Sequence, residues 1–488
     1  MSKGFKLMKG VFFKPLIIAS SVTLGVPLMV LANDVVTQGI SPATNTYQSF
    51  QNGSIARDSR LNQPLDLLND FYPAITVTMS DHENTRRRTD QDEPDTRLTI
   101  APSLAYRTNL GRHPFYVAYS GVFTRHESIE TEDAESHNLN ANLSLDLSQK
   151  WDLDLFGGIG VGFEERGISG SRSLTGIADN NRQFDALAQL NQEPDQYDYE
   201  TVGFDLAYGR KGTRLKGVFG YERTDTEFTN NDQGFTFGNL TGARDRETQS
   251  IHLDLDYSIG DRTSVFGRAQ YSEVDYIRSS NSLDSEQTDF LLGLRWKPSQ
   301  GLSGVVGVGH TEKDFIDPAR DDFSGANYYA NLSYSITPYS AISLGASRIV
   351  EEPGDEFADY YESQLLGVAW DHSLTDALSL GVFVKWIDDS YNTGREDEFT
   401  DFGITLNYDV RSWLSAGLFY GEIQRESNVG NVAYDDRYFG IQLRSDLRAL
   451  LSGSRDKDYV EPYSFEADSD ERERYSKDRV KATQPNDY

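Results

Sequence analysis

Residues 139–163 read LNANLSLDLSQKWDLDLFGGIGVGF, and this stretch sets the pattern for the rest of the chain. Over residues 139–147 every second residue is apolar, and the four residues between them are Asn, Asn, Ser and Asp. The same alternation resumes after Trp151. Successive side chains of a strand point to opposite faces, so each half predicts a strand with one apolar and one polar face. The stretch therefore predicts two antiparallel strands joined by a short turn.

The same alternation recurs from residue 72 to residue 447. Most of the segments are longer than the five or six residues usual in soluble sheets, and a tilted strand needs about 9 to 11 residues to cross a bilayer. We expect about eighteen strands, at approximately 72–80, 96–107, 114–126, 136–148, 151–165, 199–210, 213–225, 247–258, 263–277, 286–297, 302–313, 325–336, 340–351, 359–372, 378–388, 398–409, 413–426 and 434–447.

The connections between these segments alternate in length. A long polar linker follows every odd-numbered segment, the longest being 166–198, and a tight turn follows every even-numbered one. A soluble sandwich has no reason to alternate in this way, whereas bacterial outer-membrane barrels have short periplasmic turns and long external loops. We therefore expect an all-β fold: an up-and-down antiparallel transmembrane β-barrel of about 18 strands, with short periplasmic turns and long extracellular loops.

The composition suits a barrel better than a set of soluble domains. Of the 488 residues 38% are hydrophobic, the mean hydropathy is −0.55 and the net charge is −30. This apolar content is too low for several ordinary cores, but a barrel needs an apolar residue only at every second position. The absence of Cys excludes disulfide frameworks, thiol chemistry and Cys-based zinc sites. The acidic balance argues against nucleic acid as a partner.

The polar positions of the alternation predict the lining of the lumen. A barrel of this size is wide enough for an aqueous interior unless something plugs it. We expect a hydrophilic and predominantly acidic lumen that disfavours small anions, with each residue a solvated part of the wall rather than a specific binder. The predicted lumen-lining residues are Asp146, Asp152, Asp154, Asp205, Asp254, Asp256, Arg268, Asp289, Arg295 and Lys385.

An aromatic residue recurs near the end of nearly every even-numbered segment, two positions after an aliphatic one. These positions lie beside the short turns and therefore at one height on the barrel. Tyr and Trp at that height are typical of the aromatic girdle at a membrane interface. A general preference of aromatics for strands does not explain the fixed position. The predicted periplasmic girdle consists of Tyr106, Trp151, Tyr208, Tyr257, Trp296, Tyr334, Trp370 and Tyr408.

The two ends of the chain depart from the alternation. Residues 1–32 place four Lys ahead of an apolar stretch that ends in VLA, which indicates a signal peptide cleaved after Ala32. An uncleaved membrane anchor is the alternative. Loss of the four Lys would change the net charge to −30 − 4 = −34. We expect residues 33–70 to be a periplasmic lead-in, 71–448 the barrel, and 449–488 a disordered, charged periplasmic tail.

Motifs that carry catalytic or cofactor chemistry are weak in this chain. The glycines of residues 157–162 lie inside an alternating strand and precede no helix, so they favour relief of crowding on a wall over a dinucleotide site. None of the seven His residues forms a pair with metal-ligand spacing. His126, beside Glu127, could act in acid–base chemistry only if the chain were a surface enzyme. We expect no enzymatic activity, no cofactor and no metal.

Part of the barrel resembles a known family. Residues 80–86 (SDHENTR), 98–113 (LTIAPSLAYRTNLGRH) and 119–121 (YSG) resemble the start of outer-membrane β-barrels of porin type that are encoded in exopolysaccharide gene clusters. The resemblance implies a Gram-negative outer-membrane barrel that helps secreted polysaccharide cross, with a periplasmic polysaccharide-export protein as partner and no catalytic residues.

Two functions therefore lead, and a surface enzyme or adhesin that acts through its loops is a third class. The first is a passive conduit in exopolysaccharide secretion or biosynthesis, with the polysaccharide as cargo. The alternative is a general diffusion porin for small hydrophilic solutes. In either case we expect the barrel to contact outer-membrane lipid, lipopolysaccharide and the barrel-assembly machinery, because an outer-membrane barrel is inserted by that machinery and surrounded by that lipid.

Overall fold

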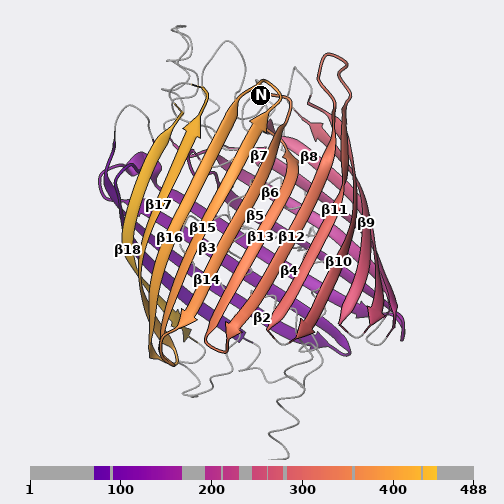
Figure 1. Cartoon of the computed structure of the whole chain (residues 1–488), viewed down its shortest axis with the longest axis horizontal. Coiled ribbons are helices and arrows are strands. Elements are labelled where there is room, and N and C mark those ends of the chain that lie inside the picture. Colours follow the sequence, from indigo (N-terminus) through magenta and orange to yellow (C-terminus); the bar gives the residue numbers. More distant parts are fainter. Residues whose placement is uncertain are drawn as a thin grey trace, which may run out of the picture.

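The alternating segments form one antiparallel sheet that closes into a tilted-strand barrel (Figure 1). A computed structural model of the chain describes residues 71–87, 92–167, 193–209, 213–229, 244–260, 262–277, 283–299, 301–353, 358–429 and 432–447. The strands are β1 (Phe71–His82), β2 (Asp95–Leu110), β3 (His113–His126), β4 (Ala134–Asp146), β5 (Trp151–Phe163), β6 (Gln196–Tyr208), β7 (Leu215–Phe228), β8 (Arg246–Gly260), β9 (Thr263–Tyr276), β10 (Ser285–Ser299), β11 (Leu302–Phe315), β12 (Phe323–Thr337), β13 (Ser340–Glu351), β14 (Tyr361–Ser373), β15 (Leu378–Tyr391), β16 (Glu396–Arg411), β17 (Leu414–Ser427) and β18 (Tyr434–Asp446).

The sheet has no free edge in the described part of the chain. Each strand pairs with its neighbours in sequence, and β1 pairs with β18, where Ala74 lies opposite Asp446 and His82 lies opposite Tyr438. In hydrocarbon an unpaired backbone N–H or C=O has no water to bond, so a spanning sheet must close. Every other strand pair in the described residues joins neighbours in sequence, so the first and the last strands are left to close the sheet.

The eighteen strands predicted from alternation are all present, and each end lies within three residues of its predicted position. The prediction of a long linker after every odd strand is wrong in two cases. The β17–β18 connection, residues 428–433, is no longer than the β6–β7 turn, residues 209–214. The connection from β15 to β16 is only residues 392–395, because both strands extend and Ser390 still pairs with Glu396. Gly394 allows the tight turn, since its φ of 84° is one that other residues rarely adopt.

The connections define two ends of the barrel, the short-turn end and the long-loop end. A short 3₁₀ turn, Glu130–Glu132, lies between β3 and β4 at the long-loop end. Across the described residues no helix is long and apolar enough to cross a membrane. The predicted signal peptide (1–32), lead-in (33–70) and tail (449–488) lie outside the described residues.

Candidate functional site: barrel lining and outer rim

Strand register places the ten predicted lumen residues on one face of the sheet. Residues directly opposite each other in an antiparallel pair point to the same face, so the face can be followed from strand to strand. Asp154 pairs with Asp205, Asp254 pairs with Arg268, and Lys385 pairs with Asp401. The remaining members join this face through Asp146–Asp152, Asp256–Phe266, Gln270–Asp289 and Ser264–Arg295.

This polar face is the concave one. Arg295 of β10 forms an ion pair with Asp256 of β8, and such a contact across the intervening β9 requires side chains that converge. Arg268 is only 4% exposed, whereas Leu253 on the opposite face is 45% exposed. An apolar face that remains exposed on a closed sheet is the one that lipid covers. The polar face therefore surrounds the interior of the barrel.

Carboxylates crowd one part of this inner wall. Asp146 lies opposite Asp152 on β4 and β5, and Asp154 lies opposite Asp205 on β5 and β6. Like charges directly opposite each other destabilise a sheet, so these pairs are not explained by stability. Basic residues lie on the same wall: the Arg268 Nε atom lies 3.5 Å from an Asp254 carboxylate oxygen. An aqueous path along this wall would attract cations and repel small anions.

Sequence reasoning missed several inner residues that the same register rule identifies. Glu222 pairs with Gly203, and Asp401 faces Lys385 with an Nζ–Oδ2 distance of 3.0 Å. His252 also faces inward, with its Nε2 atom 3.4 Å from an Asp205 oxygen. Asp401 precedes the alternating segment 402–408, so extending that alternation by one residue would have found it.

The eight predicted girdle residues share the outer face of the sheet, beside the short turns. Tyr334 pairs with Ile342 and Ile342 with Trp370, and the equivalent pairings hold around the barrel. The rings of Trp151 and Tyr208 contact each other across β5 and β6, with centroids 5.0 Å apart. Their position matches the predicted height, and their role at a lipid interface stays a prediction.

A second polar site lies at the long-loop end, where residues 164–167 follow β5. Arg87, in the loop after β1, donates to the Glu165 carboxylate at 3.0 Å and to the Arg166 carbonyl oxygen at 2.8 Å. Arg97 of β2 also binds Glu165, at 3.2 Å. Burial raises the pKa of the Glu165 carboxyl, but the guanidinium groups of Arg87 and Arg97 lower it further, to about 2. Glu165 is therefore charged at neutral pH.

The same segment is also held from the other side of the barrel seam. The Tyr434 hydroxyl of β18 donates to the Gly167 carbonyl oxygen at 2.9 Å, and Arg425 of β17 reaches that oxygen at 3.4 Å. Gly167 has a φ of 67°, and a Cβ there would lie 2.8 Å from the Tyr434 ring. Only glycine meets both requirements. We call residues 164–167 with Arg87, Arg97, Arg425 and Tyr434 the outer clasp.

Residues 164–167 of the outer clasp cannot follow the barrel wall from β5 to β17. Going through the β1–β18 pair, five strands lie between β5 and β17, so the distance along the wall is six strand spacings of ~4.8 Å, or about 29 Å. Four extended residues beyond Phe163 reach only about 14 Å. Gly167 can contact Arg425 only if the segment leaves the wall and crosses the inside of the mouth. The clasp therefore narrows the long-loop end of the barrel.

A protein-family model described as "Putative beta-barrel porin 2" matches residues 71–447, from the first strand to the last. The chain belongs to this family. The barrel is thus a porin-type barrel of the outer membrane, with its apolar face toward lipid and its polar face toward water. No curated protein sequence matches the chain.

Solved structures similar to this porin-family barrel come from Pseudomonas aeruginosa. OccK2 (OpdF) has a TM-score of 0.45 and 11% identity, over 78% of this chain and 99% of that chain. The outer membrane protein OpdK has a TM-score of 0.43 and 12% identity, over 77% and 99%. A mutant of the ferric enterobactin receptor PfeA has a TM-score of 0.42 and 10% identity, over 77% and 80%. Identities this low say nothing of what passes through the barrel.

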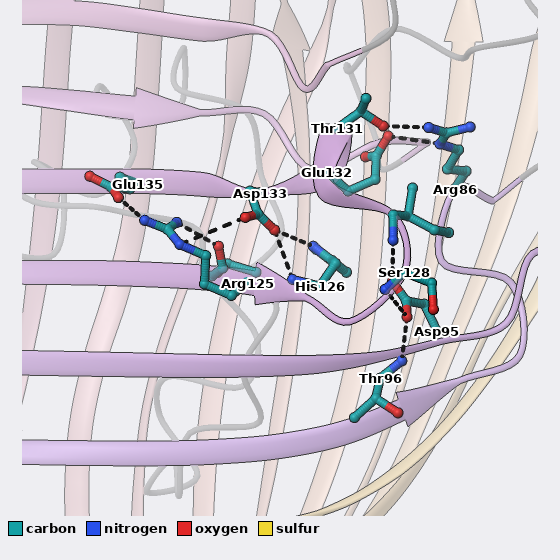
Figure 2. Close-up of polar contacts among 12 residues, drawn as sticks. Arg86, Asp95, Thr96, Arg125, His126, Ser128, Thr131, Glu132, Asp133 and Glu135 are labelled. Carbon is teal, nitrogen blue, oxygen red and sulfur yellow. Dashed lines mark hydrogen bonds and ion pairs between the residues drawn. The ribbon is translucent and has the colours of Figure 1, made fainter.

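His126, the one candidate for surface chemistry, takes part in contacts at the end of the β3–β4 hairpin of this porin-family barrel (Figure 2). Asp133 accepts a hydrogen bond from the His126 backbone amide at 2.7 Å and lies near Arg125, which also binds Glu135. Asp133 thus serves the turn between the strands. Among the described residues no three His, Asp or Glu side chains are grouped to hold a metal ion.

Proposed function

We propose that this porin-family barrel is a passive conduit for exopolysaccharide. The observation that carries the proposal is the inner face itself, which offers amide, hydroxyl and carboxylate groups on adjacent strands. On β4 these are Asn142 and Ser144, which are partly exposed and lie on the same face as Asp154 across the β4–β5 pair. A polyhydroxylated polymer can exchange its water hydrogen bonds for such groups at little net cost. The resemblance of residues 80–121 to barrels of exopolysaccharide gene clusters supports the same cargo.

The conduit would act without chemistry of its own. The polymer would enter from the periplasm at the short-turn end, where a periplasmic polysaccharide-export protein would present it, and leave at the long-loop end past the outer clasp. Lipopolysaccharide and lipid would surround the apolar face, and the barrel-assembly machinery would insert the chain after export and removal of residues 1–32. A carboxylate-rich wall would favour neutral or cationic sugars over strongly anionic ones.

Deletion of the gene tests the cargo directly. We expect loss of surface polysaccharide, with polymer retained in the periplasm, and recovery on expression of the wild-type chain. Complementation with Glu135→Gln, which removes only an exposed carboxylate at the rim, should recover secretion equally. Unchanged surface polysaccharide in the deletion strain, at unchanged precursor levels, would refute the proposal.

A general diffusion porin for small hydrophilic solutes is the second candidate, and membership in a porin family favours it. Reconstituted protein in liposomes separates the two functions. A diffusion porin should admit small neutral sugars at rates that fall smoothly with solute size, and loss of the gene should slow their uptake by cells. A polysaccharide conduit should instead show its phenotype in secretion while leaving small-solute uptake intact.

A further inference from the structure

Four inward-facing phenylalanines each lie directly opposite a glycine on the neighbouring strand. The pairs are Phe156–Gly203, Phe266–Gly293, Phe383–Gly403 and Phe419–Gly440. A phenylalanine on a wall that faces water gains nothing from hydration. The pairing of an inward phenylalanine with a glycine occurs on four separate hairpins, and hydration of the wall does not explain it. We call these four side chains the inner aromatic ring.

Each ring lies along the wall rather than pointing toward the barrel axis. A Cβ added to any of the four glycines would come within 3.0 Å of the tip of the paired phenyl ring. The glycine therefore makes room for the ring, which rests over the neighbouring backbone on one side. Phe156 and Phe383 remain partly exposed toward the interior, whereas Phe266 and Phe419 are only 9% and 7% exposed.

The four rings lie at nearly one height. Phe156, Phe383 and Phe419 are the sixth residues of β5, β15 and β17, and Phe266 is the fourth residue of β9. All four strands start at the short-turn end, so at ~3.3 Å per residue the rings are about 10–17 Å along their strands. Their strands are spread around the barrel rather than adjacent. A polymer that enters from the short-turn end meets this ring before it reaches the outer clasp.

Two of the rings, Phe266 and Phe383, have the cation of an ion pair over them. The Arg295 guanidinium lies 5.1 Å from the centroid of Phe266 and pairs with Asp256. The Lys385 ammonium lies 5.4 Å from the centroid of Phe383 and pairs with Asp401. An aromatic surface beside charged hydrogen-bonding groups matches a pyranose ring, which has an apolar C–H face and a rim of hydroxyls.

We propose that the inner aromatic ring is a sugar-stacking site for pyranose units of a polymer in transit. The inference rests on the proposed conduit function and adds the contact that the cargo makes. A stacked sugar keeps its hydroxyls toward water and the flanking ion pairs, so it is held without losing its hydration. Of the four rings, Phe156 and Phe383 have the exposed surface that a sugar contacts, and their strands are separated along the wall. Cover of the glycine backbone by the phenyl ring is the competing explanation.

Single-channel recording in planar bilayers tests the site with cellohexaose as the probe and polyethylene glycol of similar size as a non-stacking comparison. The variants are Phe156→Leu, Phe383→Leu and their combination, which keep an apolar side chain but remove the aromatic face. Phe402→Leu on β16 is the matched control, because Phe402 is an exposed aromatic on the lipid-facing side. Phe156→Trp and Phe383→Trp should retain the stacking surface.

We expect cellohexaose to interrupt the wild-type current for longer than polyethylene glycol does. Each Leu replacement should shorten the interruptions roughly 2- to 10-fold, the Phe402→Leu channel should behave as wild type, and the Trp variants should recover the long interruptions. Equal interruptions by both probes in the wild type, or Leu variants with wild-type interruptions, would overturn the proposal. Salt conductance and heat-modifiable migration in gels show whether each variant is folded, and a double variant that fails to fold leaves the two single variants to decide.

The single-channel experiment and the gene deletion test the two proposals separately. If secretion is normal in the deletion strain but the interruptions depend on the aromatic ring, the sugar-stacking site stands and the conduit function falls. If secretion is lost in the deletion strain but the Leu variants bind cellohexaose as the wild type does, the conduit stands and the aromatic rings serve the wall alone.

Discussion

Replacement of Glu165 by Gln removes the charge at the centre of the outer clasp. Glu165 is 18% exposed and its folded pKa is about 2, against an ordinary 4.5. At ~1.36 kcal/mol per pKa unit this depression corresponds to about 3 kcal/mol of stabilisation at neutral pH. A factor of ten in an equilibrium requires about 1.4 kcal/mol, so the variant should open the clasp up to roughly 100-fold more often.

Hydrogen exchange of a peptide that covers residues 164–167 measures this opening in protein reconstituted in lipid. The pH dependence has a definite sign. Because folding lowers the pKa of Glu165, its contribution is complete above pH ~4.5 and is lost as the pH falls through 2, with about 1 kcal/mol left at pH 3. Wild-type protection, corrected for the intrinsic rate, should therefore fall between pH 7 and pH 3, while that of Glu165→Gln should change little.

Glu135→Gln is the matched control for this experiment. Glu135 pairs with Arg125 at the same end of the barrel (Figure 2), but the two side chains are 44% and 46% exposed. Exposed ion pairs contribute at most about 1 kcal/mol, so the control should change protection less than about fivefold at any pH. Equal protection in wild type and Glu165→Gln at pH 7 would refute the reasoning that the clasp holds the segment.

Three further predictions concern the wall. Leu253→Arg puts a charge on the lipid face at mid-strand and should lower the free energy of unfolding in lipid by about 2–4 kcal/mol, measured by urea titration. Trp151→Ala removes the ring that contacts Tyr208 and should cost about 0.5–1.5 kcal/mol beyond the lost burial in the same titration; no cost beyond burial would show that the ring contact does not stabilise the barrel. Asp205→Asn with Asp254→Asn should reduce the preference for cations, measured as the reversal potential in a salt gradient; an unchanged potential would show that ions avoid this wall.

The wall could be read from the sequence because its rule is local. Leu253 and Asp254 are neighbours in the chain, and a strand sends neighbours to opposite faces wherever it lies in the barrel. Once the apolar face is assigned to lipid, Asp254 must face inward, and the register confirms that it shares a face with Arg268. The short-turn and long-loop asymmetry similarly orients every strand from the lengths of the connections alone.

The outer clasp and the inner aromatic ring could not be read in the same way, because each depends on which strands meet. Arg87 and Glu165 are 78 positions apart, and their contact requires residues 164–167 to leave the wall. The glycines of residues 157–162 did signal crowding, and the structure shows its source in part: Gly160 and Gly162 lie beneath the rings of Tyr199 and Tyr197. Which aromatic pairs with which glycine follows only from the register of the hairpin.

The closure of β1 on β18 has one more consequence. Both ends of the wall, Phe71 and Asp446, lie at the short-turn end, and Ala74 is directly opposite Asp446. A linker could join them without crossing the membrane. A chain that was joined there and opened instead at residues 392–395 would start at β16, finish at β15 and make every strand pair of the native wall. The strand pairing is thus cyclic. The fold does not depend on which strand is encoded first, and a circular permutation tests this.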